Sequence, residues 1–231
     1  MRSFSLVTDN DNFLVINKSA GVNFHTENNE PGLFEQVKAE LGYSDLYPVH
    51  RLDKITSGLL LIAKNKDTAA KFSTLFEERQ VQKFYLAISD KKPKKKQGLI
   101  KGDMEKSRRG GWKFASSLEN PAITQFFSHS IKPGFRLYLI KPHTGKTHQI
   151  RVALKCIKAP IIGDPLYADA WQAVKSDRCY LHAYSIAFTL NDEHFSFIVP
   201  PTEGELFQEE STQSVITEMY SDPATLAWPK L

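Results

Sequence analysis

The chain has 231 residues, a length that suits one large domain or two small ones. Its hydrophobic fraction of 41% is enough for a sizeable core, and 24% of its residues are charged, as in ordinary globular proteins. No segment has the ~20 consecutive apolar residues of a membrane helix, and the first residues lack the apolar core of a secretory signal. Two cysteines, Cys156 and Cys179, exclude a disulfide framework. We therefore expect a cytoplasmic protein without a membrane partner.

The charge is distributed unevenly along the chain. The net charge is +4, but residues 201–229 hold six acids and no lysine or arginine, which leaves 30 bases against 20 acids elsewhere. The densest basic stretch, from Lys91 to Lys113, holds ten bases and two acids. Such a surface suits a polyanion such as RNA or DNA, although a solvated lysine-rich loop explains the charge alone equally well.

Periodicity and turn signals predict the elements of the first half of the chain: a strand at 13–18, a helix at 32–42, a buried strand at 59–63, a helix at 66–80 and a strand at 81–89. Gly42 is expected to end the first helix, and Asp67 to be the N-cap of the second. The basic stretch contains Pro93 and two consecutive glycines, which favours a loop or a ragged hairpin.

The second half of the chain is predicted to be richer in strands, at 122–129, 135–142, 180–190 and 194–200, with a helix that begins near Thr147. Strands joined mostly by short turns, with a few helices between them, favour an α+β fold with a largely antiparallel sheet. We expect one domain at residues 1–200 and an acidic C-terminal tail at 201–231. The tail has one helix-like patch near 215–220 and is expected to lie over the domain.

The stretch HRLDKITSGLLLIAK, residues 50–64, combines charged side chains with a predicted turn. Arg51 and Asp53 precede an apolar strand that has no need of charged neighbours, and Gly58 allows a sharp bend. A common interpretation is an aspartate that caps its own turn beside a solvated arginine. The alternative is a site that uses both the cation and the carboxylate.

A second constellation lies in HTGKTHQIRVALK, residues 143–155. Thr147 can cap a helix, and Lys146, His148 and Arg151 would then surround the helix N-terminus. A helix N-terminus with three basic side chains suits an anion. That anion is either a phosphate or the carboxylate of Asp53.

Five stretches resemble, in order and spacing, the motif series of the RluA family of RNA pseudouridine synthases: HRLDKITSGLLLIAKN, KFYLAIS, HTGKTHQIRVAL, IIGDPLY and YLHAYSIAF. The resemblance spans roughly residues 13–200. It implies the pseudouridine synthase fold, a largely antiparallel mixed central sheet flanked by helices and loops, without the extra N-terminal RNA-binding domain of many relatives. It also implies a monomer that isomerises specific uridines in ribosomal or transfer RNA stem-loops, with neither cofactor nor metal.

The resemblance also implies roles for single residues. Asp53, the aspartate of the H-R-L-D motif, would be catalytic, and Arg151 would pair with it and favour its ionised form. Tyr85, in KFYLAIS, would stack on uracil and act in proton removal from the base, unless it is simply a core aromatic. Arg51 would help to extrude the target nucleotide and occupy the vacated space.

Basic residues outside this catalytic set are expected to contact RNA. Together with Arg51, the predicted RNA-binding residues are Lys94, Lys95, Lys96, Arg108, Arg109, Lys146 and His148. The chain departs from the family pattern at Ala153, where a histidine is usual, and at Ser19, where a proline is usual.

Two alternatives remain open. The first is an RNA-binding protein with the same fold and no catalysis. The second is a metal-dependent hydrolase with His50, Asp53, His148 and His182 as ligands, although their spacing matches no strong metal motif. Activity in excess chelator would separate a synthase from a metal hydrolase.

Overall fold

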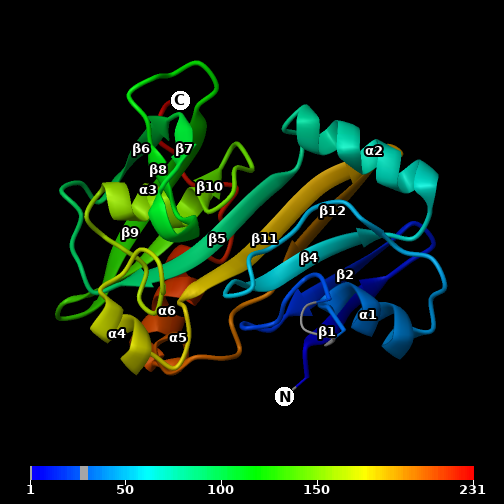
Figure 1. Cartoon of the computed structure of the whole chain (residues 1–231), viewed down its shortest axis with the longest axis horizontal. Coiled ribbons are helices and arrows are strands. Elements are labelled where there is room, and N and C mark those ends of the chain that lie inside the picture. Colours follow the sequence, from blue (N-terminus) through cyan, green and yellow to red (C-terminus); the bar gives the residue numbers. More distant parts are fainter. Residues whose placement is uncertain (1, 27–30) are drawn as a thin grey trace. The chain divides into compact units, whose positions relative to one another are not determined.

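The computed structural model describes residues 2–26 and 31–231. The chain forms two compact units, which we call unit 1 and unit 2. Unit 1 comprises the described residues up to Gln82 together with His182–Val199, and unit 2 comprises Lys83–Leu181 and Pro200–Leu231. Figure 1 labels most of the helices and strands. In the part of the chain that the structure describes, no helix is long and apolar enough to cross a membrane.

Unit 1 is built on a sheet with strand order β1-β2-β4-β11-β12, in which β3 also pairs with β4. All its ladders are antiparallel except the one between β4 and β11. Its elements are β1 (Phe4–Asp9), β2 (Phe13–Lys18), α1 (Leu33–Leu41), β3 (Tyr47–Pro48), β4 (Ser57–Ala63), α2 (Lys66–Glu77), most of β11 (Leu181–Leu190) and β12 (Glu193–Ile198).

The core of unit 1 forms around β2. Alternate residues of a strand point to opposite faces, and on one face Phe13 packs edge-on against Phe72 of α2 and Phe188 of β11. Leu14 and Ile16, which point the other way, are also fully buried. Both faces of β2 are therefore covered, and α2 runs alongside β4 (Figure 1).

Gly58 allows β4 and β11 to approach one another. Its φ is +110°, and a Cβ atom at this position would lie 2.3 Å from the carbonyl oxygen of Ala183, its partner in the parallel ladder. Only glycine fits such a close backbone contact. The bend that the sequence predicts at this residue thus also sets the register of β4, at the end of the turn that carries Asp53.

Unit 2 has an antiparallel sheet of order β5-β10-β9-β6 and a separate two-stranded hairpin, β7-β8. Its elements are β5 (Gln82–Ser89), β6 (Gln97–Gly102), β7 (Met104–Lys106), a 3-10 turn (Arg108–Gly110), β8 (Trp112–Phe114), β9 (Ala122–Lys132), β10 (Phe135–Pro142), α3 (Gln149–Cys156), α4 (Ala170–Lys175), α5 (Glu205–Gln208) and α6 (Glu210–Met219).

The predicted fold class is confirmed: the structure is α+β, and its sheet ladders are mostly antiparallel. The basic stretch forms the predicted hairpin, but it also contributes β6, which the sequence analysis missed. Helix α2 is capped by Asn65, whose side chain accepts a hydrogen bond from the Thr68 amide at 2.8 Å, so the prediction of Asp67 as N-cap was wrong. Asp67 is the second residue of the helix, where its negative charge still stabilises the positive end of the helix dipole.

The acidic tail packs within unit 2 through aromatic residues and through an ion pair between Glu209 and Lys132 of β9. Trp228 stacks on Phe84 of β5, with ring centroids 5.6 Å apart, and contacts Phe127 of β9 at 4.7 Å. Phe207 of α5 is fully buried. The helical patch expected near 215–220 belongs to the longer helix α6, which begins at Glu210.

The close approach at Gly58 predicts an unusual sensitivity to substitution. Gly58→Ala should destabilise the protein by more than about 3 kcal/mol. The new methyl group would clash with backbone atoms of Ala183, and only a separation of β4 from β11 could relieve the clash. The matched control is Gly42→Ala, which also has positive φ, +72°, but open space at the Cβ position, and should cost about 1–2 kcal/mol. Urea unfolding of both variants measures the difference, and equal losses would contradict this account.

Candidate active site

The H-R-L-D motif ends in a tight turn. The amide of Thr56 donates to the carbonyl oxygen of Asp53 at 3.0 Å, so the turn closes over residues 53–56. Leu52 is buried and anchors the segment in the core of unit 1, whereas Arg51 is exposed and Asp53 is half-buried. The turn therefore presents a cation to solvent and keeps the carboxylate partly shielded.

A buried lysine fixes the backbone of this turn. Lys18 has no exposed surface, and its ammonium donates to the carbonyl oxygens of Ser19 at 2.9 Å, Lys54 at 3.1 Å and Thr56 at 2.8 Å. A buried ammonium is tolerated only where acceptors replace water, so the peptide groups after Asp53 are held in place by Lys18. Lys18 was not among the predicted site residues, although a lysine that follows four apolar residues and an asparagine in a predicted strand is a signal for a buried cation.

Two histidines of unit 1 form hydrogen bonds within that unit. The Nε2 atom of His50 accepts from the Leu61 amide at 2.9 Å. His182, which is buried, lies 2.8 Å from the Val199 carbonyl through Nε2 and 2.7 Å from the Ser57 hydroxyl through Nδ1. A carbonyl can only accept, so Nε2 carries the proton, and in the neutral ring Nδ1 accepts from Ser57.

These contacts give the metal-hydrolase alternative no support. Nε2 of His50 and both ring nitrogens of His182 form hydrogen bonds with protein atoms of β4 and of the loop after β12. Among the residues that the structure describes, no group of three or more His, Cys, Asp or Glu side chains could hold a metal ion.

In unit 2, Arg151 binds Asp164 through two parallel hydrogen bonds. The Nε atom lies 2.7 Å from Oδ2 and the Nη2 atom lies 3.0 Å from Oδ1, and the two side chains are 4% and 0% exposed. Asp164 belongs to the IIGDPLY motif, to which the sequence analysis gave no role. A buried, bidentate pair of this kind fixes the orientation of the guanidinium.

Gln149 organises the loop that leads into α3. Its Oε1 atom accepts from the Thr144 hydroxyl at 2.7 Å and the Lys146 amide at 3.0 Å, and its Nε2 atom donates to the Thr124 hydroxyl at 3.0 Å. The prediction that Thr147 caps the helix was wrong, because α3 begins at Gln149 with the preceding histidine as N-cap. The buried side chain of Gln149 fixes the loop, because it is long enough to reach both the loop and β9.

Tyr85 lies on the same face of the unit 2 sheet as α3. Tyr85 is opposite Ile140 in the ladder, and Ile140 is opposite Phe126 of β9. Thr124, two residues before Phe126, shares that face and bonds to Gln149 of α3. The tyrosine is half-buried, whereas the neighbouring residues of β5 on the other face are fully buried.

Lys83 precedes Tyr85 by two residues and therefore shares its face of β5. Burial lowers the pKa of the Lys83 ammonium. Lys83 was not among the predicted site residues, although it directly precedes the apolar and aromatic run FYLAI of the predicted strand.

The predicted RNA-binding lysines are accessible. Lys94, Lys95 and Lys96 form an exposed bend before β6, and in the described part of the chain no hydrogen bond or ion pair engages their ammonium groups. The main chain is nevertheless fixed, because the Lys96 carbonyl accepts from both the amide and the hydroxyl of Ser128, at 2.7 and 3.0 Å. The side chains are thus exposed on an anchored backbone.

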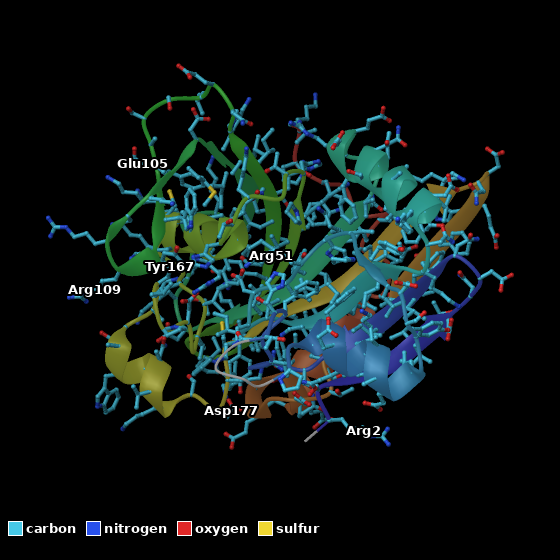
Figure 2. All side chains as sticks on the ribbon, turned by 45° about the vertical axis from the view of Figure 1, so that its right-hand side comes forward. Arg2, Arg51, Glu105, Arg109, Tyr167 and Asp177 are labelled. Atoms are coloured by element: carbon cyan, nitrogen blue, oxygen red, sulfur yellow. The ribbon has the colours of Figure 1, made fainter. Side chains whose placement is uncertain are left out.

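The remaining basic residues lie at two places in unit 2. Arg108 and Arg109 are exposed at the tip of the β7-β8 hairpin, and Figure 2 shows Arg109 projecting outward from it. Lys146 and His148 lie half-buried on the loop before α3. Hydrogen bonds, the largest from Ser117, lower the pKa of Asp103, and the positive charge of Lys146 adds to this effect.

The buried ion pair predicts a large difference between two substitutions of the same type. Asp164→Asn should destabilise the protein by about 3–5 kcal/mol, because it removes the charge that binds the buried guanidinium of Arg151 bidentately. Asp9 pairs with Lys64 nearer the surface, where the side chains of Asp9 and Lys64 are 31% and 18% exposed. Asp9→Asn should therefore lower the free energy of unfolding by at most about 1 kcal/mol. Chemical unfolding of both variants tests this, and a loss at Asp164 no larger than that at Asp9 would refute it.

The chain is similar to known proteins over most of its length. The family model described as RNA pseudouridylate synthase matches residues 12–155. An "Uncharacterized RNA pseudouridine synthase" of Haemophilus influenzae is 48% identical over 202 residues, which cover 87% of this chain and 89% of that protein. A "Ribosomal large subunit pseudouridine synthase C" of Rickettsia bellii is 36% identical, and the match covers 80% of this chain but 63% of the relative's length.

Solved structures share the fold. The structure titled "Human RNA Pseudouridylate Synthase Domain Containing 1" aligns with a TM-score of 0.74 and 26% identity, and the alignment covers 86% of this chain and 83% of that one. The family match spans more than half of the chain, and the Haemophilus relative covers most of it. The chain therefore belongs to the RNA pseudouridylate synthase family, and the predicted enzyme class, an RNA pseudouridine synthase, is confirmed.

Proposed function

We propose that this enzyme converts uridines of ribosomal RNA to pseudouridine with Asp53 as the catalytic carboxylate. The observation that carries the proposal is the turn at the H-R-L-D motif, where a half-buried aspartate follows an exposed arginine on a backbone held by Lys18. The choice of ribosomal RNA is supported by relatives named ribosomal large subunit pseudouridine synthases C and D, from Rickettsia bellii and Borreliella burgdorferi.

The reaction is an isomerisation whose atoms balance without a co-reactant. The bond between N1 of uracil and C1′ of ribose breaks, the base rotates, and a bond from C5 to C1′ replaces it. The proton on C5 leaves, and N1 gains one. Asp53 supplies the carboxylate for this exchange, and Tyr85 stacks on the base and takes part in removal of the C5 proton.

Arg151 supplies the positive charge that favours the ionised form of Asp53, as the family resemblance implies. Its Nε and Nη2 atoms bind Asp164, so the edge of the guanidinium formed by Nη1 and Nη2 is the one that a second carboxylate would use. In this proposal Asp164 holds Arg151 in the orientation that the reaction requires.

Arg51 and the basic surface of unit 2 handle the RNA. Arg51 is exposed beside Asp53 and takes the place of the extruded nucleotide, because chemistry on a stacked base requires its removal from the stack. Positioning through the phosphates falls to the basic residues Lys94, Lys95, Lys96, Arg108, Arg109, Lys146 and His148.

Asp53→Asn should abolish pseudouridine formation while RNA binding survives. Asparagine keeps the size and hydrogen-bonding capacity of aspartate but lacks the carboxylate, and a fall of more than about 100-fold is expected. Release of tritium from 5-³H-uridine in ribosomal RNA, with a transfer RNA stem-loop as a second substrate, measures turnover. The surface variant Asp45→Asn is the control. Turnover within tenfold of wild type would exclude Asp53 as the catalytic residue, and a wild-type protein that binds RNA without turnover would favour the non-catalytic alternative.

Replacing Lys94, Lys95 and Lys96 with alanine should weaken RNA binding and flatten its salt dependence. Phosphate contacts release counterions, so affinity falls with salt at a log–log slope of ~0.7 per contact on single strands. Single-turnover chemistry at saturating RNA should change little, because these lysines position the RNA and do not contact uracil. Fluorescence anisotropy over a salt series measures the slope. A triple alanine variant at Lys38, Lys66 and Lys71 of α1 and α2 removes the same charge as a control. Curves that overlap with wild type for the first variant would show that this bend does not bind RNA.

A further inference from the structure

The last residue of the IIGDPLY motif, Tyr167, joins three parts of unit 2. Its amide donates to Oδ1 of Asp164 at 3.1 Å. Its phenolic oxygen accepts from the main-chain amide of Trp112 in β8 at 2.7 Å and lies 2.9 Å from Nδ1 of His148. The residue is 6% exposed. In Figure 2 it lies on the inner side of the hairpin whose tip carries Arg109.

The ring of Tyr167 also packs against the guanidinium that Asp164 holds. The guanidinium carbon of Arg151 lies 5.0 Å from the ring centroid, and the ammonium of Lys155 lies 5.4 Å from it. Cations at this distance are attracted to the face of an aromatic ring. Tyr167 therefore contacts Arg151 directly through its ring and indirectly through Asp164.

The β7-β8 hairpin depends on an external anchor. Each of its strands has three residues, and within the described part of the chain it pairs with no third strand. An isolated two-stranded hairpin is at best marginally stable. The hydrogen bond from Trp112 to the buried phenol of Tyr167 supplies a fixed point at the base of the tip, where Arg108 and Arg109 are exposed.

His148 links the same phenol to α3. It is the N-cap of that helix and has a φ of +57°, which is uncommon for a residue other than glycine. Its contact with Tyr167 restrains this conformation, and Arg151 follows three residues later on the first turn of the helix. One hydroxyl group thus connects the hairpin to the start of the helix that carries Arg151.

We infer that Tyr167 is a positioning residue that couples the placement of the arginine-tipped hairpin on RNA phosphates to the orientation of Arg151. The inference rests on the proposed function, because it assumes that the hairpin contacts RNA and that Arg151 acts on Asp53. Phosphate contacts at Arg109 then stabilise the hairpin in one position, and the phenol transmits that position to His148 and Arg151.

The test uses Tyr167→Phe in the full chain. Phenylalanine keeps the ring beneath Arg151 and the amide that bonds to Asp164, and it removes only the hydroxyl group. We expect KM for the RNA to rise and kcat to fall, each by about five- to tenfold, as for the loss of one or two hydrogen bonds. The Trp112 amide should exchange its hydrogen faster in the variant. Tyr43→Phe, which loses a hydroxyl bound to Asp9 in unit 1, should match wild type in all three measurements.

A double-mutant cycle with Arg109→Ala separates coupling from simple structural damage. If the phenol transmits the position of the hairpin, Arg109→Ala should lower kcat/KM about tenfold in wild type but less than about threefold in the Tyr167→Phe background. A merely structural tyrosine predicts effects that multiply to within about twofold. Multiplying effects, or an unchanged kcat/KM in Tyr167→Phe with unchanged exchange at Trp112, would overturn the inference.

Two further measurements keep the outcomes distinct. If Tyr167→Phe fails to fold, His148→Asn tests the same link, because asparagine tolerates positive φ but is too short to reach the phenol. It should reproduce the expected fall in kcat at saturating RNA, which the loss of a phosphate contact by His148 would not cause, and an unchanged kcat would count against the coupling. Wild type and Asp53→Asn are measured in the same assay. An inactive wild type or an active Asp53→Asn contradicts the proposed function, whereas an active wild type with an unaffected Tyr167→Phe contradicts only the coupling.

Discussion

The ion pair between Arg151 and Asp164 is the interaction on which the arrangement of unit 2 depends. Charges that are almost completely removed from water are tolerated only when every oxygen and nitrogen has a partner. The carboxylate of Asp164 accepts two hydrogen bonds from Arg151 and one each from the amides of Leu166 and Tyr167. The carboxylate of Asp164 thus fixes the main chain of the residues that follow it, and it also binds α3 through Arg151.

Unit 1 solves a similar problem by different means. Its buried cation, Lys18, is balanced by carbonyl oxygens of the main chain, two of which belong to the turn after Asp53. A carbonyl oxygen has a partial charge and a fixed direction, so the lysine orders the backbone of the turn. The guanidinium in unit 2, by contrast, is ordered by a full countercharge. Each buried cation is therefore ordered by contacts within its own unit.

The sequence predicted the elements whose burial follows a simple period. The strands around 13–18, 81–89 and 135–142 appear almost as expected, because their apolar residues fill the cores of the two units. Strand β6 was missed because its lysine and two glycines resemble a loop, and only its ladder with β9 makes it a strand. Its hydrogen bonds join residues about 25 positions apart, which no local pattern reveals.

The site was predictable where a motif fixes a residue and was not where side chains meet through the fold. The turn at Asp53 and the exposure of Arg51 agree with the motif. Arg151 has a bidentate partner thirteen residues away, Asp164, which was not among the predicted site residues. Likewise, Gln149 fixes its loop by reaching across to β9, a contact that the choice of Thr147 as a cap did not anticipate.

The aromatic anchor at Trp228 gives the C-terminal segment a place in the core of unit 2. Phe84, on which Trp228 stacks, precedes Tyr85 in β5, and the two side chains point to opposite faces of the sheet. The indole therefore backs the strand from which Tyr85 projects. A genetic fusion, affinity tag or proteolytic cut that displaces Trp228 would therefore disturb the packing behind the strand that carries Tyr85.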